Sequence, residues 1–240
     1  MLRGLRGFVF DLDGCVWNGT VLNPGAREVL TALHAGGRRL AFLSNNSRAT
    51  GSDLRERLHA LGVDAAEHVL TPLEIIGQVI AAITRGGHDI LDVKDWRSAT
   101  VVAVGNDFDL TYERLTAACR AAVAGAALVT PNLDRRLPIE GGDFLPGCGA
   151  IVEAVAVAAG VRPLVVGKPE PPLFLIALRQ LGLPAAGVAM VGDSVPSDIR
   201  GGRAVGMHTV LYAPDGAGEA RDADLVVRSF SELATLAGLG

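Results

Sequence analysis

Short apolar runs alternate with amphipathic segments along the chain, and this alternation predicts strands and helices in turn. Residues 8–10 are the first apolar run and the first predicted strand. Residues 23–37 follow as a predicted helix, with Asn23 as its N-cap, Pro24 at its first position and two glycines at its end. The chain therefore begins with a strand that leads into a helix.

The same alternation continues to the end of the chain. Further strands are predicted at 38–46, 99–105, 127–130, 163–167, 187–193, 208–212 and 225–227. Further helices are predicted at 54–62, 75–83, 111–126, 150–160 and 172–181, with a short one from Ser197. Strands separated by helices are typical of a layered α/β fold with a parallel sheet.

One segment breaks the pattern. Residues 131–149 are rich in glycine and proline and show no period of either kind. Loops of this length inside a compact protein are usually functional or disordered. We therefore expect a long irregular connection there.

Polar side chains follow four of the predicted strands. Asp11 and Asp13 come directly after the first strand, and Ser44, Lys168 and Asp193 come at the ends of three later strands. Because the carboxyl ends of parallel strands lie along one edge of a sheet, we expect these side chains to converge on one crevice.

This set of side chains suits phosphoryl transfer. Carboxylates in one crevice repel each other unless a cation lies among them, and a hard ion such as Mg²⁺ pairs with both carboxylates and phosphates. The hydroxyl and backbone N–H groups of residues 44–47 are suited to an anion pocket, and Lys168 adds positive charge. One carboxylate is then a candidate nucleophile and another a candidate general acid and base.

Charge and hydropathy exclude other partners. A net charge of −4 and a pI near 5.7, without a block of Lys and Arg, argue against nucleic acid. The first apolar stretch runs straight into acidic residues, so we expect no signal peptide. No apolar run reaches the roughly 18 residues that a membrane span needs, so no membrane partner is expected.

Cysteine and histidine add no metal site. Cys15, Cys119 and Cys148 are odd in number and far apart, which predicts reduced thiols and a cytoplasmic protein. The five histidines are scattered and lack metal-ligand spacing. A mean hydropathy of +0.34 is compatible with a homodimer, but the sequence does not fix the oligomeric state.

The motifs "DLDGCVWNG", "LSNNS", "VGKPEP" and "GDSVPSDI", in this order, resemble those of the haloacid dehalogenase-like (HAD) hydrolases. The likeness is greatest to the NagD-like and p-nitrophenyl phosphatase-like branch. It implies a Rossmann-like parallel-sheet core, residues 1–74 and 164–240, with a smaller inserted α/β cap of the C2 type, residues 75–163. It also implies a Mg²⁺-dependent phosphatase that hydrolyses a small phosphorylated metabolite through an aspartyl-phosphate.

The resemblance assigns roles to the first two motifs. Asp11 matches the nucleophile, and Asp13 matches the general acid and base whose backbone carbonyl also binds Mg²⁺. Gly14 lets the backbone pass close to the phosphate. Ser44 and the backbone N–H of Asn45 match the groups that bind the transferring phosphoryl group.

The later motifs complete the set. Lys168 matches the lysine that neutralises the phosphoryl oxygens and orients the nucleophile. Asp193 matches the carboxylate that holds Mg²⁺ together with Asp11, and Asp198 lies in or next to that shell. In the cap, Asn132 and Asp134 are candidate substrate-specificity residues, although both also suit plain turn formation.

Two other functions compete with a phosphatase. A dehalogenase would use Asp11 to attack carbon, but that reaction needs neither a metal nor a proton donor, so Asp13 and Asp193 argue against it. A non-catalytic phosphate-binding or regulatory protein, such as a receiver-like domain, is the second alternative. Receivers are about half this length and arrange their acids differently, so we expect the phosphatase.

Overall fold

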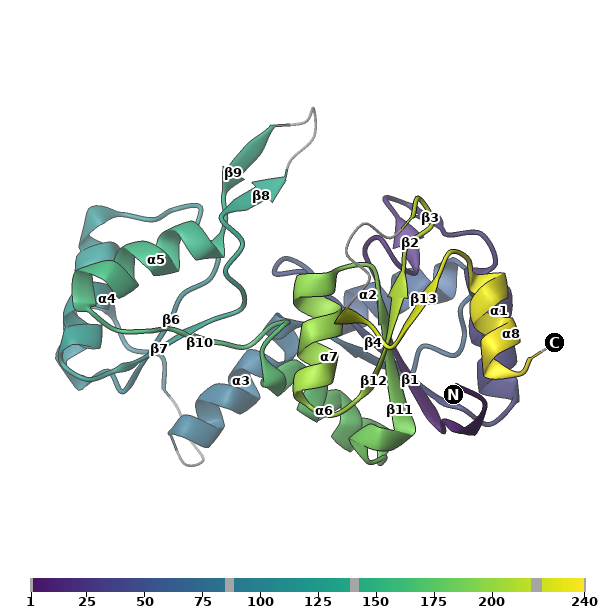
Figure 1. Cartoon of the computed structure of the whole chain (residues 1–240). Helices are drawn as coiled ribbons and strands as arrows, with labels where there is room; N and C mark the ends of the chain where they lie inside the picture. The colour runs from purple at the N-terminus through teal and green to yellow at the C-terminus, as the bar shows by residue number, and fades with distance from the viewer. Residues whose placement is uncertain (1, 85–88, 139–142, 217–221, 240) are drawn as a thin grey trace. The chain divides into compact units, whose positions relative to one another are not determined.

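The computed structural model describes residues 2–84, 89–138, 143–216 and 222–239 (Figure 1). The chain forms two compact units, residues 1–71 with 167–240 and residues 72–166. The domain boundaries predicted from the sequence, after residues 74 and 163, each differ by three residues from the boundaries in the structure, after residues 71 and 166.

The first unit is built on a six-stranded parallel sheet in the order β13-β12-β11-β1-β4-β5. Its strands are β1 (Gly7–Asp11), β4 (Arg39–Leu43), β5 (His68–Leu70), β11 (Val188–Gly192), β12 (His208–Tyr212) and β13 (Leu225–Val227). The chain runs outward from β1 to β5 and then returns to the other side of β1 at β11. The strand order therefore reverses between β1 and β11, and open α/β sheets bind ligands at the carboxyl ends of such strands.

Helices cover both faces of this sheet. In Figure 1, α1 (Ala26–Ala35) and α8 (Phe230–Ala237) lie on the opposite side of the sheet from α6 (Pro171–Leu181) and α7 (Arg200–Ala204). The apolar side chains of α2 (Gly51–Ala60) join the core on the α1 and α8 side. Because both faces are covered, β1 and β11 are buried at every residue and have continuous rather than alternating apolar sequences.

Aromatic side chains form the centre of this core. The ring of Phe10 lies 6.2 Å from that of Phe8, 6.0 Å from Phe42 and 6.3 Å from Phe230, measured between centroids. These rings join two strands and one helix, and Phe10 stands next to Asp11 in the chain. The packing that stabilises the sheet thus also fixes the strand end that carries the first acid.

A short antiparallel hairpin, β2 (Trp17–Asn18) and β3 (Val21–Leu22), follows β1. The predicted role of Asn23 as a helix cap is wrong, because α1 begins at Ala26 after Gly25 and has no side-chain cap. The Asn23 amide instead donates to the carbonyl oxygens of Gly14 and Cys15, at 3.1 and 2.6 Å. Asn23 therefore holds the loop that carries the first motif.

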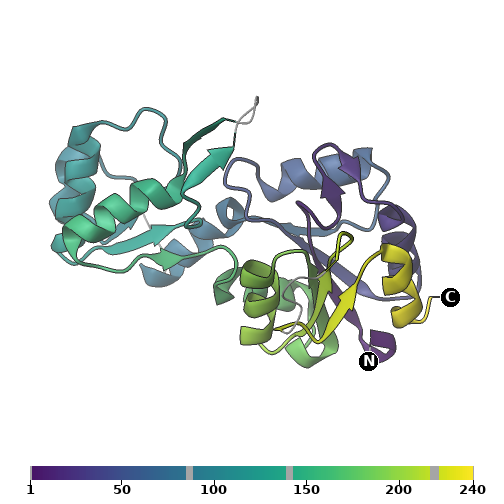
Figure 2. The same cartoon turned by 45° about the horizontal axis from the view of Figure 1, so that its top comes forward.

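The second unit has its own small sheet. The parallel strands β6 (Val101–Ala103), β7 (Ala127–Thr130) and β10 (Leu164–Val165) lie in the order β10-β7-β6. The helices α4 (Tyr112–Val123) and α5 (Cys148–Ala159) pack on one face of it around a shared apolar core (Figure 2). The helix α3 (Pro72–Ile83) and the 3-10 turn η2 (Val93–Ser98) precede these elements.

The prediction of an irregular connection over 131–149 is wrong for the part that the structure describes. Two short strands, β8 (Arg136–Pro138) and β9 (Phe144–Pro146), pair as an antiparallel hairpin, and α5 begins at Cys148. Residues 139–142 lie outside the described residues. They include the first two residues of the segment "GGDFLPGCG" (141–149), which the family resemblance makes a further candidate for substrate specificity. Three-residue strands that end in proline are too short to show a period of two.

Several short elements are absent from the prediction. They are β5, the β2–β3 hairpin, α8, and the 3-10 turns η1 (Leu2–Gly4), η2 and η4 (Ala185–Gly187). The short helix predicted from Ser197 is a π-helical turn, η5 (Val195–Ile199), that continues into α7. Cys15, Cys119 and Cys148 are free thiols. Within the four described ranges, every helix is too short or too polar to cross a bilayer.

Candidate active site

The reversal of strand order brings the first and last motifs together. Asp11 ends β1, and Asp193 follows the last residue of β11, its neighbour in the sheet. On the other side, Asp11 pairs with Leu43 of β4, and Ser44 comes next in the chain. Three predicted site residues therefore lie at one edge of one sheet, as expected from the parallel topology.

Lys168 is buried between two carboxylates. Its Nζ donates to Asp11 Oδ1 in a short contact and to Asp198 Oδ1 at 2.6 Å. The side chains of Lys168, Asp11 and Asp198 are 3%, 7% and 1% exposed. Burial alone would lower the pKa of Lys168, but the charges of Asp198 and Asp11 outweigh it and raise the pKa, so the ammonium persists at neutral pH.

Lys168 does not stand at a strand end of the main sheet, and this part of the prediction is wrong. The preceding strand, β10, pairs with β7 in the second unit's sheet. Lys168 instead lies in the turn before α6. The apolar run at 163–167 predicts a strand correctly, but such a run does not reveal which sheet the strand joins.

The Asn45 side chain fixes this turn. Its Nδ2 donates to the carbonyl oxygen of Lys168 at 2.8 Å, and its Oδ1 accepts from the backbone N–H of Lys168 at 2.8 Å. The amide therefore clasps both backbone groups of the residue whose ammonium reaches Asp11. This side-chain contact is additional to the phosphate-binding role expected of the Asn45 backbone.

Three carboxylates form a cluster that suits a hard cation. Oxygens of Asp11, Asp193 and Asp198 lie within 4.8 Å of one another, and Asp193 is the exposed member. With Lys168, the ionised group carries an excess of two negative charges. Burial and the charge of Asp198 raise the pKa of both Asp11 and Asp193, although Lys168 opposes this. A divalent cation such as Mg²⁺ would relieve this repulsion.

Two glycines make room for the cluster. Gly14 has a φ of +94°, and a Cβ at this position would overlap the carboxylate of Asp193. A Cβ on Gly192 would overlap the side chain of Asp198. The closeness of the carboxylates to the backbone therefore requires glycine at both positions.

Asp13 lies outside the cluster, with its exposed carboxylate held by two donors. Its Oδ1 accepts from the indole Nε1 of Trp17 at 2.9 Å, and its Oδ2 accepts from Ser44 Oγ at 3.0 Å. The Ser44 hydroxyl also accepts from the Asn46 backbone N–H at 3.0 Å. The two aspartates of the first motif thus have different surroundings, one buried against a lysine and the other open to solvent.

The two candidate specificity residues belong to the second unit. Asn132 is buried, and its Oδ1 accepts from the backbone N–H of Asp134 at 3.1 Å. The carbonyl oxygen of Asp134 accepts from the Gly149 N–H at the start of α5, and burial raises the pKa of its carboxyl. The turn-forming contact favours the structural alternative for Asn132, and a substrate role for either residue stays a prediction.

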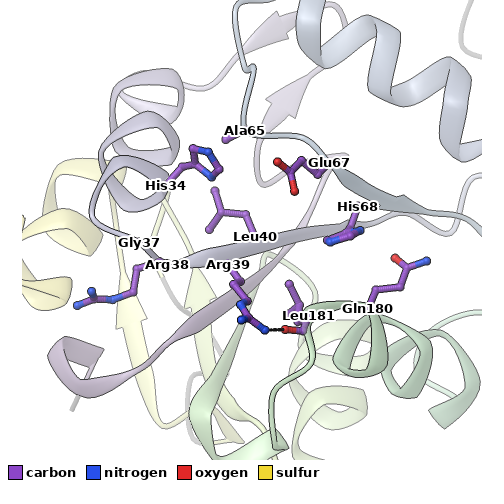
Figure 3. Close-up of a pocket in the computed structure, with 10 residues that line it drawn as sticks. All are labelled: His34, Gly37, Arg38, Arg39, Leu40, Ala65, Glu67, His68, Gln180 and Leu181. Carbon is purple, nitrogen blue, oxygen red and sulfur yellow. Dashed lines mark hydrogen bonds between the residues drawn. The ribbon is translucent and has the colours of Figure 1, made fainter.

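A separate pocket of about 330 Å³ lies at the opposite edge of the main sheet (Figure 3). The pocket lies where β4 and β5 begin. Its lining residues are His34, Gly37, Arg38, Arg39, Leu40, Ala65, Glu67, His68, Gln180 and Leu181. The Arg39 guanidinium donates to the Leu181 carbonyl. Since β4 has five residues, its two ends are roughly 13 Å apart, which separates this pocket from the carboxylates.

Family models match most of the chain. A model described as haloacid dehalogenase-like hydrolase matches residues 8–110, and a second, described as HAD-hydrolase-like, matches residues 165–233. The acid sugar phosphatase of Staphylococcus aureus is 34% identical over 228 residues, which cover 87% of this chain and 86% of that protein. The chain belongs to the haloacid dehalogenase-like hydrolases.

Solved structures of this family agree in fold. A p-nitrophenyl phosphatase from Archaeoglobus fulgidus has a TM-score of 0.83 and 29% identity, over 97% of this chain and 99% of that one. The 4-nitrophenylphosphatase of Thermotoga maritima has a TM-score of 0.83 and 27% identity, over 98% of both chains. The predicted fold, branch and enzyme class, a HAD-like phosphatase, are confirmed.

Three contacts of the site are not evident from the sequence. They are the hydrogen bond from Trp17 to Asp13, the direct ion pair of Asp198 with Lys168, and the two hydrogen bonds of the Asn45 side chain to the Lys168 backbone. The four-residue spacing of Asp13 and Trp17 was visible, but only the β2–β3 hairpin turns the indole back onto the acid.

Proposed function

We propose that this protein is a Mg²⁺-dependent phosphatase that hydrolyses small phosphomonoesters through an aspartyl-phosphate on Asp11. The observation that carries the proposal is the arrangement of charges at the β1–β11 switch point. Phosphoryl transfer needs a carboxylate nucleophile beside a positive charge, carboxylates that can hold a metal ion, and an acid that can reach the leaving group. Here the buried Asp11 is paired with Lys168, two further carboxylates lie close to it, and the fourth acid, Asp13, is exposed.

In the first half-reaction, an oxygen of Asp11 attacks phosphorus and the bond from phosphorus to the leaving oxygen breaks. Asp13 gives its proton to that oxygen, so the alcohol departs neutral. In the second half-reaction, Asp13 removes a proton from water, the water oxygen attacks phosphorus, and phosphate leaves with Asp11 regenerated. The exposure of Asp13 suits a group that meets both the alcohol and the water.

Lys168 and Ser44 would act on the charge of the phosphoryl group. The ammonium beside Asp11 would attract the phosphoryl oxygens and hold the attacking carboxylate in one orientation. The Ser44 hydroxyl, next to Asp13, would donate to a phosphoryl oxygen together with the Asn45 backbone N–H. The Asn45 side chain would hold Lys168 in position through its two hydrogen bonds to the Lys168 backbone.

Asp11, Asp193 and Asp198, with the backbone carbonyl of Asp13, would hold Mg²⁺. The excess of two negative charges in the cluster fits one divalent ion. When bound, the ion supplies positive charge that screens the nucleophile from the negatively charged substrate.

Sugar phosphates are the substrate class that we favour, because the curated relatives are acid sugar phosphatases. Activity on p-nitrophenyl phosphate is expected in addition, as in the names of the structural relatives. We propose the second unit as the cap that selects among substrates, with Asn132 and Asp134 as candidates. The homodimer and the cytoplasmic location stay predictions.

The test is phosphate release from a panel of sugar, nucleoside and aryl phosphates, with Mg²⁺ or with EDTA. We expect turnover only with Mg²⁺, and a loss of at least about 10³-fold in Asp11→Asn, because the nucleophile is removed. Asp64→Asn, at an aspartate that is 92% exposed, is the matched control and should leave turnover unchanged. Absence of release from every substrate would contradict the proposal and favour a non-catalytic phosphate-binding role.

A further inference from the structure

The side chain of Trp17 joins the β2–β3 hairpin to the carboxylate of Asp13. The indole Nε1 donates to Asp13 Oδ1 at 2.9 Å, while the ring itself is fully buried in the core. The other oxygen of Asp13, Oδ2, faces the Ser44 hydroxyl at 3.0 Å. The two oxygens of this exposed acid therefore have different partners.

We propose that Trp17 is a positioning residue that selects which oxygen of Asp13 carries the transferable proton, and that Arg57 fixes Trp17 for this role. The proposal rests on the proposed function, because it concerns the acid that protonates the leaving alcohol.

The selection follows from the chemistry of the two donors. An indole N–H can donate a hydrogen bond but cannot accept one, so the oxygen facing it must be an acceptor in both protonation states of Asp13. That oxygen is Oδ1, and the proton of the acid form is left to Oδ2. The Ser44 hydroxyl can donate or accept, so it tolerates either state of Oδ2.

The backbone holds the indole in place from both sides of Asp13. The N–H of Trp17 donates to the Leu12 carbonyl at 3.0 Å, and the carbonyl of Trp17 accepts from the Gly14 N–H at 2.8 Å. Trp17 is thus tied to the two chain neighbours of the acid that it contacts. These two backbone hydrogen bonds set the distance from the indole to Asp13.

Arg57 secures the outer side of the indole. Its guanidinium carbon lies 4.1 Å from the centroid of the Trp17 ring, and its Nη2 donates to the Gly19 carbonyl in the turn of the hairpin. Arg57 belongs to α2, which packs on the main core. A rigid helix therefore clamps both the ring and the turn that carries it.

A positioning role for Trp17 predicts a loss of activity that depends on the substrate, which a packing role does not predict. An alkoxide is a poor leaving group and needs a proton in the transition state, whereas p-nitrophenolate leaves with little help. Misdirecting the proton of Asp13 should therefore slow phosphoryl transfer from alkyl phosphates selectively. The ratio kcat/KM isolates this step, because it reports only events up to the first irreversible one.

The experiment compares kcat/KM for a sugar phosphate and for p-nitrophenyl phosphate, with Mg²⁺, in Trp17→Phe and Arg57→Gln. For Trp17→Phe we expect kcat/KM for the sugar phosphate to fall by at least about tenfold. General acid catalysis contributes about 10²–10⁴-fold, and the variant should lose part of this contribution. On p-nitrophenyl phosphate we expect less than about a threefold loss. Arg57→Gln, which leaves the indole N–H in place, should show the same selectivity with a smaller loss.

Two matched controls come from the same chain. Trp96→Phe changes the other tryptophan, whose ring also lies under an arginine, at 4.3 Å from Arg97, in the second unit. Arg55→Gln changes an exposed arginine of the same helix. Both should leave both values of kcat/KM unchanged.

Equal losses on the two substrates in Trp17→Phe would overturn the proposal and reduce Trp17 to a packing residue, as would no loss on either. Should Trp17→Phe not fold, Arg57→Gln alone decides by the same criterion. Failure of the proposed function is recognised separately, because Asp11→Asn would then keep its turnover. If Asp11→Asn is inactive and Trp17→Phe is unselective, only the positioning role is overturned.

Discussion

Lys168 is one of only two lysines in a chain with 22 basic residues, and it is buried between Asp11 and Asp198. An ammonium is compact and donates in three directions, whereas a guanidinium is a planar fork. The space between two carboxylates that are 7% and 1% exposed suits the compact ion. This is the physical reason for a lysine at this position in a chain whose other basic residues, Lys94 apart, are arginines.

Lys168→Arg is therefore expected to impair the enzyme despite keeping the charge. The larger group would push Asp11 from its orientation, and we expect a fall in kcat of about 10²–10³-fold, as for the loss of one transition-state donor. Steady-state kinetics with Mg²⁺ and p-nitrophenyl phosphate measure it. Lys94→Arg, at the other lysine, is the control, and a value of kcat for Lys168→Arg equal to that of the control would contradict this account.

At this scale the sequence predicted the residues better than their contacts. Asp11, Asp13, Ser44, Lys168 and Asp193 are all in the first unit, as the motifs implied, but the partners of each side chain were not readable. The clasp of Asn45 on Lys168 joins residues 123 positions apart, and no local pattern encodes such a contact. Asn23 was misassigned because asparagine before proline is a common helix start, while the loop at Gly14 competes for the same amide.

At the scale of elements, β1 has two functions. It is a central strand of the core and it ends in Asp11, the proposed nucleophile. Phe10 provides the link, because its ring contacts Phe8, Phe42 and Phe230 while its chain neighbour is Asp11.

Phe10→Ala is expected to destabilise the protein by about 3–5 kcal/mol, the range for deleting a buried aromatic side chain. Urea unfolding followed by circular dichroism measures this loss. Phe108→Ala removes a phenylalanine that is 68% exposed and should change the midpoint little. Equal midpoints for the two variants would contradict the central place of Phe10 in the core.

Asp224, the residue before β13, links this strand to β12 by hydrogen bonds to Thr209. Its Oδ2 accepts from the backbone N–H and the hydroxyl of Thr209, at 2.8 and 3.1 Å, and Arg203 lies 3.4 Å away. Burial alone would raise the pKa of Asp224, but these hydrogen bonds and the arginine outweigh it and lower the pKa. A carboxyl with a lowered pKa stabilises the fold above its unfolded pKa and stops doing so as the pH falls through the folded value.

Asp224→Asn should therefore lower the free energy of unfolding near pH 7 by less than about 1 kcal/mol, because the group is exposed and the ion pair screened. The difference from wild type should disappear as the pH falls below about 4. Denaturant midpoints over a pH series measure both. A difference that grows on acidification would contradict the assigned direction of the pKa shift.

The longer strands of the main sheet were predictable from their apolar runs, although the eight-residue helix α8 was missed. The strands β1, β4, β11 and β12 each have five residues and were predicted within a few positions. Of the three-residue strands, β6 and β13 are wholly apolar and were predicted, whereas β5, β8 and β9 each include a histidine, an arginine or a proline and were not. The assignment of β10 to a separate sheet depends on pairing with β7, which only the folded chain reveals.

For the whole molecule, the proposed Mg²⁺ site would connect activity with stability. The carboxylates of Asp11, Asp193 and Asp198 repel one another in the folded protein, and burial raises the pKa of Asp11 and Asp193. An ion that binds only the folded state stabilises it by mass action.

Mg²⁺ should therefore raise the unfolding midpoint of the wild-type protein in the absence of substrate. At one hundred times its dissociation constant the gain is about 2.7 kcal/mol. In Asp193→Asn, which removes the exposed member of the cluster, this gain should be largely lost. Thermal unfolding at several Mg²⁺ concentrations measures it, and the same Mg²⁺ response in Asp193→Asn and wild type would contradict the assigned ligands.

The proposed reaction depends on a covalent intermediate on Asp11, and mass spectrometry of the Asp13→Asn variant can detect it. With p-nitrophenyl phosphate and Mg²⁺, the first half-reaction needs little acid, while hydrolysis lacks its base. We predict that the variant gains the mass of one HPO₃ group, on the peptide that contains Asp11, and that the double variant Asp11→Asn, Asp13→Asn gains none. A wild-type enzyme that releases phosphate while the Asp13→Asn variant forms no adduct, or forms it on another peptide, would contradict the account.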